Sequence, residues 1–230
     1  MQVHASAEQI KAIQTTFINK VYAWMTLALS ITGFVALRTL QSYDLMNFLI
    51  GSGNGIMILF LVELGIVFWL VSRINSMSVN MAIGMFLLYS ALNGFTLSII
   101  LLAYTGASIA STFFITAGTF GAFSLYGYFT KKDLSGWGSL LYMALIGLII
   151  ASVVNLFMRS EMFYYIMSYI GVLIFVGLTA YDTQKIKQLS LTVDADSEEG
   201  RKGAILGALT LYLDFINMFI FLLRIFGNRR

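Results

Sequence analysis

Long apolar runs separated by short polar joints dominate the 230-residue chain. A helix needs about 20 apolar residues to cross a bilayer. Seven runs of roughly that length carry at most one charged residue each, namely 17–37, 55–71, 79–103, 107–130, 135–158, 162–181 and 203–223. The apolar residues are continuous within each run, whereas the strands of a membrane barrel alternate apolar and polar positions. The pattern therefore predicts an all-α polytopic membrane protein with seven transmembrane helices.

The composition excludes a soluble domain. Hydrophobic residues make up 59% of the chain and charged residues 11%, against roughly 25% charged residues in soluble domains. No soluble domain or linker interrupts the runs. We therefore expect a polar N-terminal tail over 1–16 and one seven-helix domain over 17–230, with 182–202 as its principal cytoplasmic loop.

Several chemistries lack their residues. The chain has no cysteine, which excludes disulfides, thiolate metal sites and a cysteine nucleophile. Its single histidine, His4, lies in the polar tail, so haem ligation and a histidine metal site are not expected. The net charge is only +3 and the basic residues are scattered through the joints, which argues against nucleic acid binding. We expect no enzyme and no resident cofactor.

The distribution of lysine and arginine predicts the orientation, because these residues are enriched on the cytoplasmic side. Nine of them lie on the cytoplasmic side if the N-terminus is inside: Lys11, Lys20, Arg73, Lys131, Lys132, Lys185, Lys187, Arg201 and Lys202. The basic C-terminal residues Arg224, Arg229 and Arg230 fit this orientation poorly, since seven crossings place them outside. A re-entrant last segment, or one segment that does not fully cross, would remove the conflict. The side of the C-terminus stays open.

Ionisable residues inside a span are costly in lipid, so each is a functional hypothesis. Lys20 lies near the start of the first run, where a lysine can extend to the membrane surface. For Glu63 two interpretations stay equally open: a carboxyl packed within the protein or facing water, and a carboxyl with a functional role. Asp214 lies near the centre of the last run, and Asn217 follows three residues later on the same helical face. Asp182 ends the sixth run.

Helix counting brings the two aspartates to a similar depth. If the sixth helix continues to about residue 191 and the seventh begins near 205, Asp182 and Asp214 each lie nine residues from their helix ends. Two carboxyls in a poorly hydrated site cannot both ionise at low cost, so the pair would share a proton and sense pH. Deprotonated, Asp182 and Asp214 would transiently bind a hard cation such as Ca²⁺. Alternatively, Asp182 caps a helix end while Asp214 hydrogen-bonds within the bundle.

Four stretches resemble one known family. Residues 104–128 read YTGASIASTFFITAGTFGAFSLYGY, and residues 130–138 read TKKDLSGWG. The aspartate motifs are AYDTQ at 180–184 and LYLDFIN at 211–217. Together with the seven runs they resemble the Bax inhibitor-1 family, the transmembrane Bax-inhibitor-motif proteins, and in particular its bacterial members. The resemblance covers nearly the whole chain.

The resemblance implies a fold and an activity. The family fold is a bundle of seven helices in which the last helix is wrapped by the other six. The implied activity is a pH-dependent calcium leak controlled by a pair of aspartates. By motif these are Asp182 and Asp214. The resemblance also implies a location in the bacterial inner membrane and a role in the stress response. Similar proteins carry an arginine near the end of the second helix that latches the first aspartate. Here Val71 and Ser72 precede Arg73, so Arg73 is either a displaced latch or an anchor at the interface.

Two other functions compete with the leak. Some bacterial relatives act as regulators, and a partner or inhibitor of a membrane-bound quality-control protease is the alternative. An intramembrane aspartyl protease also needs two facing aspartates. Such proteases pair a tyrosine-aspartate motif with a glycine-any-glycine-aspartate motif. In this chain Leu211, Tyr212 and Leu213 precede Asp214, with no glycine among them, so this reading is disfavoured. A retinal pump would need a lysine in the last run, which has none.

Overall fold

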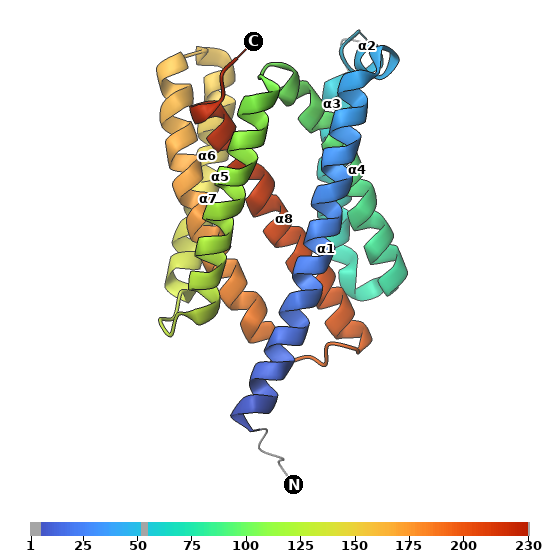
Figure 1. Cartoon of the computed structure of the whole chain (residues 1–230), viewed down its shortest axis with the longest axis vertical. Helices are drawn as coiled ribbons and strands as arrows, with labels where there is room; N and C mark the ends of the chain where they lie inside the picture. Colours follow the sequence, from blue (N-terminus) through green and yellow to red (C-terminus); the bar gives the residue numbers. More distant parts are fainter. Residues whose placement is uncertain (1–5, 52–54, 230) are drawn as a thin grey trace. The chain divides into compact units, whose positions relative to one another are not determined.

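The computed structural model describes residues 6–51 and 55–229. Residues 1–5, with His4, and residues 52–54 and 230 lie outside the described part. The described part contains eight α-helices, one 3₁₀ turn and no strand. The helices are α1 (Ala7–Gln41), α2 (Tyr43–Gly51), α3 (Gly55–Arg73), α4 (Val79–Leu102), α5 (Gly106–Phe129), α6 (Ser135–Met158), α7 (Glu161–Leu189) and α8 (Glu198–Phe226), with the turn η1 at Ile74–Ser76 (Figure 1). All but α2 are long and apolar enough to cross a membrane, which confirms the predicted fold class.

The first helix begins earlier than the hydropathy indicates. Ser6 caps it: its side chain accepts a hydrogen bond from the backbone N–H of Gln9 at 3.2 Å, and the Gln9 side chain accepts one from the Ser6 N–H at 2.8 Å. This reciprocal pair is a capping box. Residues 7–16 of the predicted polar tail are therefore helical, while residues 1–5 of that tail lie outside the described residues. The joint predicted at 38–54 contains the short helix α2.

The loop predicted at 182–202 is wrong in its bounds. The helix α7 continues to Leu189 and α8 already begins at Glu198, so only residues 190–197 connect them. At about 1.5 Å per residue, the 29 residues of α8 form one unbroken helix longer than the roughly 30 Å hydrocarbon core of a bilayer. This length argues against a re-entrant last segment.

The chain divides into two compact units, and α8 contributes to both. The first unit contains the described residues up to 103 together with 188–209. In it α1 and α3 both pack against α4 (Figure 1). The α1–α4 contact is close at Gly94, where an added Cβ would lie 2.7 Å from the Thr32 carbonyl oxygen. The Thr32 hydroxyl donates to the Ser90 carbonyl at 2.7 Å, so a polar contact reinforces the close packing.

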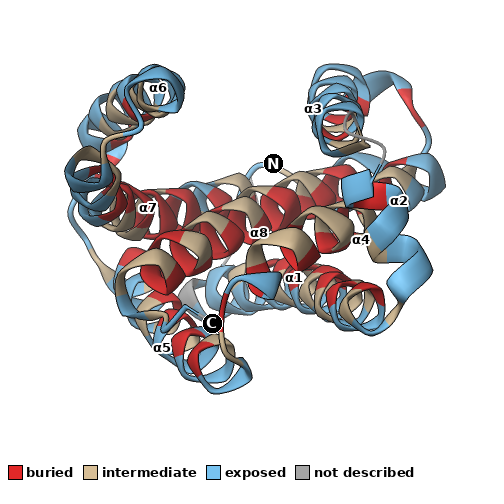
Figure 2. Ribbon diagram, turned by 90° about the horizontal axis from the view of Figure 1, so that it is seen from above, coloured by how far each residue is buried: buried red, intermediate tan, exposed pale blue. Residues whose placement is uncertain are grey.

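The second unit contains α5, α6, most of α7 and the C-terminal part of α8. Aromatic side chains of α5 and α8 meet edge to face in this unit, with ring centroids 5.6 Å apart for Phe113 and Phe215 and for Phe120 and Phe215. Of the seven long helices α8 is the most buried (Figure 2). In its apolar 18-residue stretch 72% is buried, whereas the corresponding share is at most 39% in each of the other six helices.

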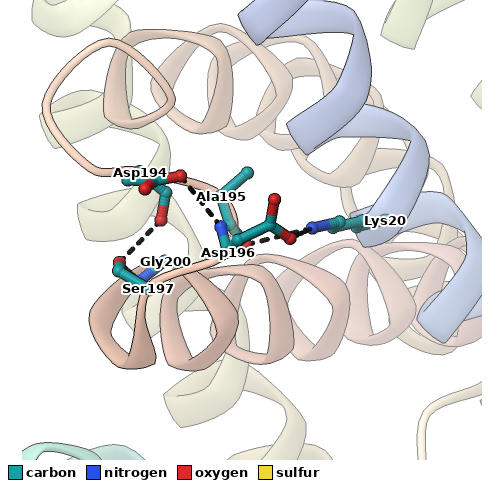
Figure 3. A network of polar contacts seen from close by, with 6 residues as sticks. All are labelled: Lys20, Asp194, Ala195, Asp196, Ser197 and Gly200. Atoms are coloured by element: carbon teal, nitrogen blue, oxygen red, sulfur yellow. Dashed lines mark hydrogen bonds and ion pairs between the residues drawn. The ribbon is translucent and has the colours of Figure 1, made fainter.

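The loop between α7 and α8 is held by Lys20 of α1 (Figure 3). The Lys20 ammonium donates to Asp196 Oδ1 at 2.6 Å and to the Ala195 carbonyl at 3.1 Å. Within the loop, the carbonyl oxygen of Asp194 accepts a hydrogen bond from the Ser197 hydroxyl at 2.6 Å. Lys20 therefore extends beyond its span and ties the start of α8 to α1.

Replacing Lys20 by methionine should loosen this loop. The hydrogen bond from Lys20 lowers the pKa of Asp196, so the contact is complete above the usual aspartate pKa of about 4 and is lost as pH falls below it. In the Lys20→Met protein, amide exchange at residues 194–197 should be several-fold faster at neutral pH, and in the wild type the same protection should fade only under acid. Lys11→Met, on the same helix, is the control and should leave protection unchanged. Equal protection in all three proteins would contradict the anchor.

Candidate functional site: a buried aspartate pair

Two glycines allow α7 to approach α5 and α6 closely just before Asp182. A Cβ at Gly127 of α5 would overlap the carbonyl oxygen of Ala180. A Cβ at Gly138 of α6 would overlap the ring of Tyr181. Small residues at helix contacts are the usual means of close approach in membranes. The backbone that carries Asp182 is therefore held against both neighbouring helices.

The two residues after Asp182 fix this part of α7 through polar contacts. The Thr183 and Ser124 hydroxyl oxygens lie 2.9 Å apart in the buried interior. The Gln184 side chain accepts from the Leu134 N–H at 2.9 Å and donates to the Lys132 carbonyl at 2.8 Å. The motif Asp182-Thr183-Gln184 therefore supplies one carboxylate and two anchors, and the anchors bind α7 to α5 and to the α5–α6 connection.

The carboxylate of Asp182 is buried and accepts a hydrogen bond from a tyrosine. Its side chain is 2% exposed, and the Tyr142 hydroxyl of α6 lies 3.2 Å from Oδ1 and 3.5 Å from Oδ2. The Tyr142 ring packs edge to face on Tyr181, with centroids 6.1 Å apart. Sequence reasoning missed Tyr142. It lies four residues after Gly138, so both share the face of α6 that meets α7, but nothing in the apolar run marks that face.

Asp214 of α8 is buried without a full set of hydrogen bonds. The residue is 4% exposed, and its Oδ2 atom accepts no hydrogen bond from any described residue. The charges of Asp182 and Asp214 are close enough to act on each other and on the Tyr142 hydroxyl. The structure thus brings the predicted pair together within the second unit and adds Tyr142 as a third member.

The helix count that suggested the pair used a wrong helix start. In the structure Asp182 lies seven residues before the end of α7, whereas Asp214 lies sixteen residues after the start of α8. The polar segment Glu198–Lys202 is helical, although hydropathy alone assigns it to the loop. The two aspartates are therefore neighbours because of how α7 and α8 pack in the second unit, and equal distance from the helix ends is not the reason.

The donor set limits what the pair can hold. In the described ranges 6–51 and 55–229 no cluster contains three or more His, Cys, Asp or Glu side chains. Asp182, Asp214 and the Tyr142 hydroxyl offer hard oxygen donors, which suit Ca²⁺, but Ca²⁺ takes six to eight oxygen ligands in a resident site. These three donors are fewer than a resident calcium site requires.

The other predicted residues lie apart from the pair. The Asn217 amide donates to the Leu213 carbonyl at 2.8 Å, within its own helix. In the first unit, Glu63 is 6% exposed and accepts a 2.6 Å hydrogen bond from the Thr96 hydroxyl. The Arg73 side chain is exposed at the end of α3. Within the part of the chain that the structure describes, Arg73 forms no ion pair.

Comparison with known proteins identifies the family. A family model described as "Inhibitor of apoptosis-promoting Bax1" matches residues 14–230. The chain is 51% identical to the inner membrane protein YbhL of Escherichia coli (strain K12), over 98% of this chain and 97% of that protein. It is 46% identical to a protein of Rickettsia prowazekii (93% and 90% covered) and 40% identical to a membrane protein of Streptococcus pyogenes serotype M1 (92% of each). The chain therefore belongs to the Bax inhibitor-1 family.

Proposed function

We propose that this protein is a pH-sensitive calcium leak channel of the bacterial inner membrane, gated by protonation of Asp182 and Asp214. The observation that carries the proposal is the Asp214 carboxyl: one of its oxygens is buried with no hydrogen-bond partner among the described residues, beside a second buried carboxyl. A buried polar atom without a partner costs free energy. Such a cost suits a group that exchanges protons or cations.

The pair supplies a two-state switch. With one proton shared between the carboxyls, the pair carries a single negative charge and α7 and α8 are drawn together at this point. With both carboxyls ionised, mutual repulsion favours separation, and two negative oxygen donors attract a hard divalent cation. A local charge change then biases the arrangement of packed helices, which is how protonation switches act in general.

The orientation and location follow from two observations. The relative from Escherichia coli is an inner membrane protein, and the same location is proposed here. The distribution of lysine and arginine favours a cytoplasmic N-terminus, which is part of the proposal. Calcium ions are the proposed cargo and protons the proposed regulator. The lipid bilayer is the only partner that the proposed leak requires.

Calcium entry into synthetic vesicles tests the proposal. Purified protein, reconstituted in liposomes that contain a calcium dye, should admit calcium faster than empty vesicles, at a rate that changes between about pH 5 and 8. No entry above that of empty vesicles at any pH would contradict the channel. It would favour the regulator hypothesis, in which the protein acts on a membrane-bound protease, and co-purification from native membranes would then identify the protease.

Tyr142→Phe should shift the pH response without abolishing the leak. The change removes the hydroxyl that donates to Asp182 at 3.2 Å and leaves the ring that packs on Tyr181. Hydrogen bonds to a charged acceptor contribute about 1.5–3 kcal/mol, so the pH midpoint of calcium entry should rise by roughly one to two units. Tyr169→Phe, an exposed tyrosine of α7, is the control. An unchanged midpoint in Tyr142→Phe would show that the hydroxyl does not act on the pair.

A further inference from the structure

Three arginines gather at one end of the second unit without an acidic partner. Arg159 follows the last residue of α6, Arg224 lies in the last turn of α8, and Arg229 follows α8. Glu161 is the nearest acidic residue in sequence to Arg159. Among the described residues it forms no ion pair with any of the three. Their positive charge is therefore not neutralised within the part of the chain that the structure describes.

These arginines lie on the side where arginine is usually sparse. Five spans precede the α6–α7 turn and seven precede the C-terminus, so both ends lie on the side opposite the N-terminus, and Figure 1 shows them at the same end of the second unit. In the proposed orientation this is the outer side, where lysine and arginine are depleted. An uncompensated basic cluster there calls for an anion that the protein does not itself supply.

Two members of the cluster, Arg159 and Arg229, line a cavity of about 260 Å³. The cavity is lined by Asn155, Arg159, Ser160, Glu161, Tyr164, Tyr165 and Arg229. Two cationic side chains thus line one concave site together with hydroxyl and amide groups and one carboxylate, so the charged side chains of the lining leave a net positive charge. This volume is several times the roughly 30 Å³ that one water molecule occupies in the liquid. A phosphate group with its ester oxygens therefore has room in the cavity.

The arginines are positioned by aromatic rings. The guanidinium carbon of Arg224 lies 4.9 Å from the centroid of the Tyr164 ring, and that of Arg229 lies 5.7 Å from the same centroid. Cations held over aromatic faces in this way keep their hydrogen-bond donors available. A hydrogen bond with Tyr104 raises the pKa of Arg229, so its charge is permanent. The Tyr164 ring therefore holds two of the three guanidinium groups at this end of the second unit.

The backbone at Arg159 is left-handed, with φ of 50°. A non-glycine residue in this region carries a small steric cost, and glycine is the usual residue at this position of a helix C-terminus. An arginine here places a guanidinium at the cavity where glycine would place none.

Exposed apolar side chains are next in sequence to residues that line the cavity. Met158 is 63% exposed and Met162 is 76% exposed, and Tyr165 lines the cavity and is itself exposed. At a helix end in a membrane protein such side chains lie among lipid chains and headgroups. A phosphate bound between the arginines would therefore continue naturally into acyl chains along α6 and α7.

We propose that this cavity binds the phosphodiester headgroup of an anionic phospholipid, held by Arg159 and Arg229. The guanidinium groups match the paired oxygens of a phosphodiester, and the exposed methionines contact the glycerol and acyl region. The site is independent of the aspartate pair. The bound headgroup would neutralise the arginines at this end of the second unit, and the lipid would belong to the leaflet on the side of the C-terminus.

Native mass spectrometry tests this site directly. Purified protein in detergent should retain one phosphatidylglycerol molecule per chain, under conditions that remove phosphatidylcholine. Each arginine near a membrane surface adds about fivefold to the binding of anionic lipid, so Arg159→Gln combined with Arg229→Gln should lower retention by roughly twentyfold. The double change Arg38→Gln with Arg201→Gln removes equal charge elsewhere and should retain the lipid.

Three outcomes would overturn the site. Equal retention of phosphatidylglycerol and phosphatidylcholine by the wild type would show that no anionic headgroup is recognised. Equal loss in both double variants would reduce the effect to net charge. Displacement of the lipid by millimolar inorganic phosphate would assign the cavity to a free anion. Arg159→Lys with Arg229→Lys keeps the charge and should retain the lipid within about fivefold, which excludes misfolding as the cause of a loss.

Discussion

Gly127→Ala should lower the free energy of unfolding by about 3 kcal/mol, the upper end of what overpacking usually costs. The added carbon would overlap the carbonyl oxygen of Ala180, which is backbone and cannot rotate away. The two helices α5 and α7 would have to separate two residues before Asp182. Thermal unfolding in detergent measures the loss.

Gly121→Ala is a matched control for this change. Gly121 lies on the same helix, but an added Cβ would meet no atom within 4 Å. Alanine is also the better helix former, so Gly121→Ala should leave the unfolding temperature unchanged or raise it slightly. Similar losses at both positions would show that α5 tolerates no substitution of glycine, and would contradict the specific contact with α7.

Asp214→Leu should make the protein more stable while it removes the sensor. Leucine carries no polar atom, so the change removes the buried Oδ2 that lacks a partner. An unsatisfied buried polar group costs about 1–3 kcal/mol, and replacing a poorly paired buried charge by an apolar residue often stabilises a protein. We expect a gain of that size in thermal unfolding.

Asn217→Leu separates this gain from a general preference for leucine. Asn217 lies three residues further along α8, and its amide already donates to the Leu213 carbonyl. Since that polar group is satisfied, Asn217→Leu should give no comparable gain. An Asp214→Leu protein that unfolds at a lower temperature than the wild type would show that the carboxyl is fully paired in the native state, contrary to the proposed site.

Hydropathy predicted the membrane spans well, because only the apolar part of each helix is selected by lipid. The run at 135–158 coincides with α6 (Ser135–Met158). Helix ends that extend into water leave no such trace. The start of α1 at Ala7 depends on the Ser6 cap, and the start of α8 at Glu198 lies among charged residues, so both were missed.

The aspartates could be found from the sequence, and their setting could not. A carboxyl in an apolar run is conspicuous, because lipid penalises it. Tyr142 is an ordinary residue in such a run, and its role depends on α6 facing α7 across Gly138. Asn217 shares a helical face with Asp214 but bonds to its own backbone. The spacing of residues along one helix predicts which of them share a helical face. Which residues form hydrogen bonds depends on how the helices pack.

The central claim is that Asp182 and Asp214 together set the pH response of a calcium leak. The most direct test is calcium entry into dye-loaded liposomes, scanned from about pH 5 to 8, for wild type and for Asp182→Asn combined with Asp214→Asn. The account predicts entry that changes several-fold with pH in the wild type and varies by less than about twofold in the double variant, which has no proton to exchange at the pair. The same pH-dependent entry in both proteins would contradict it.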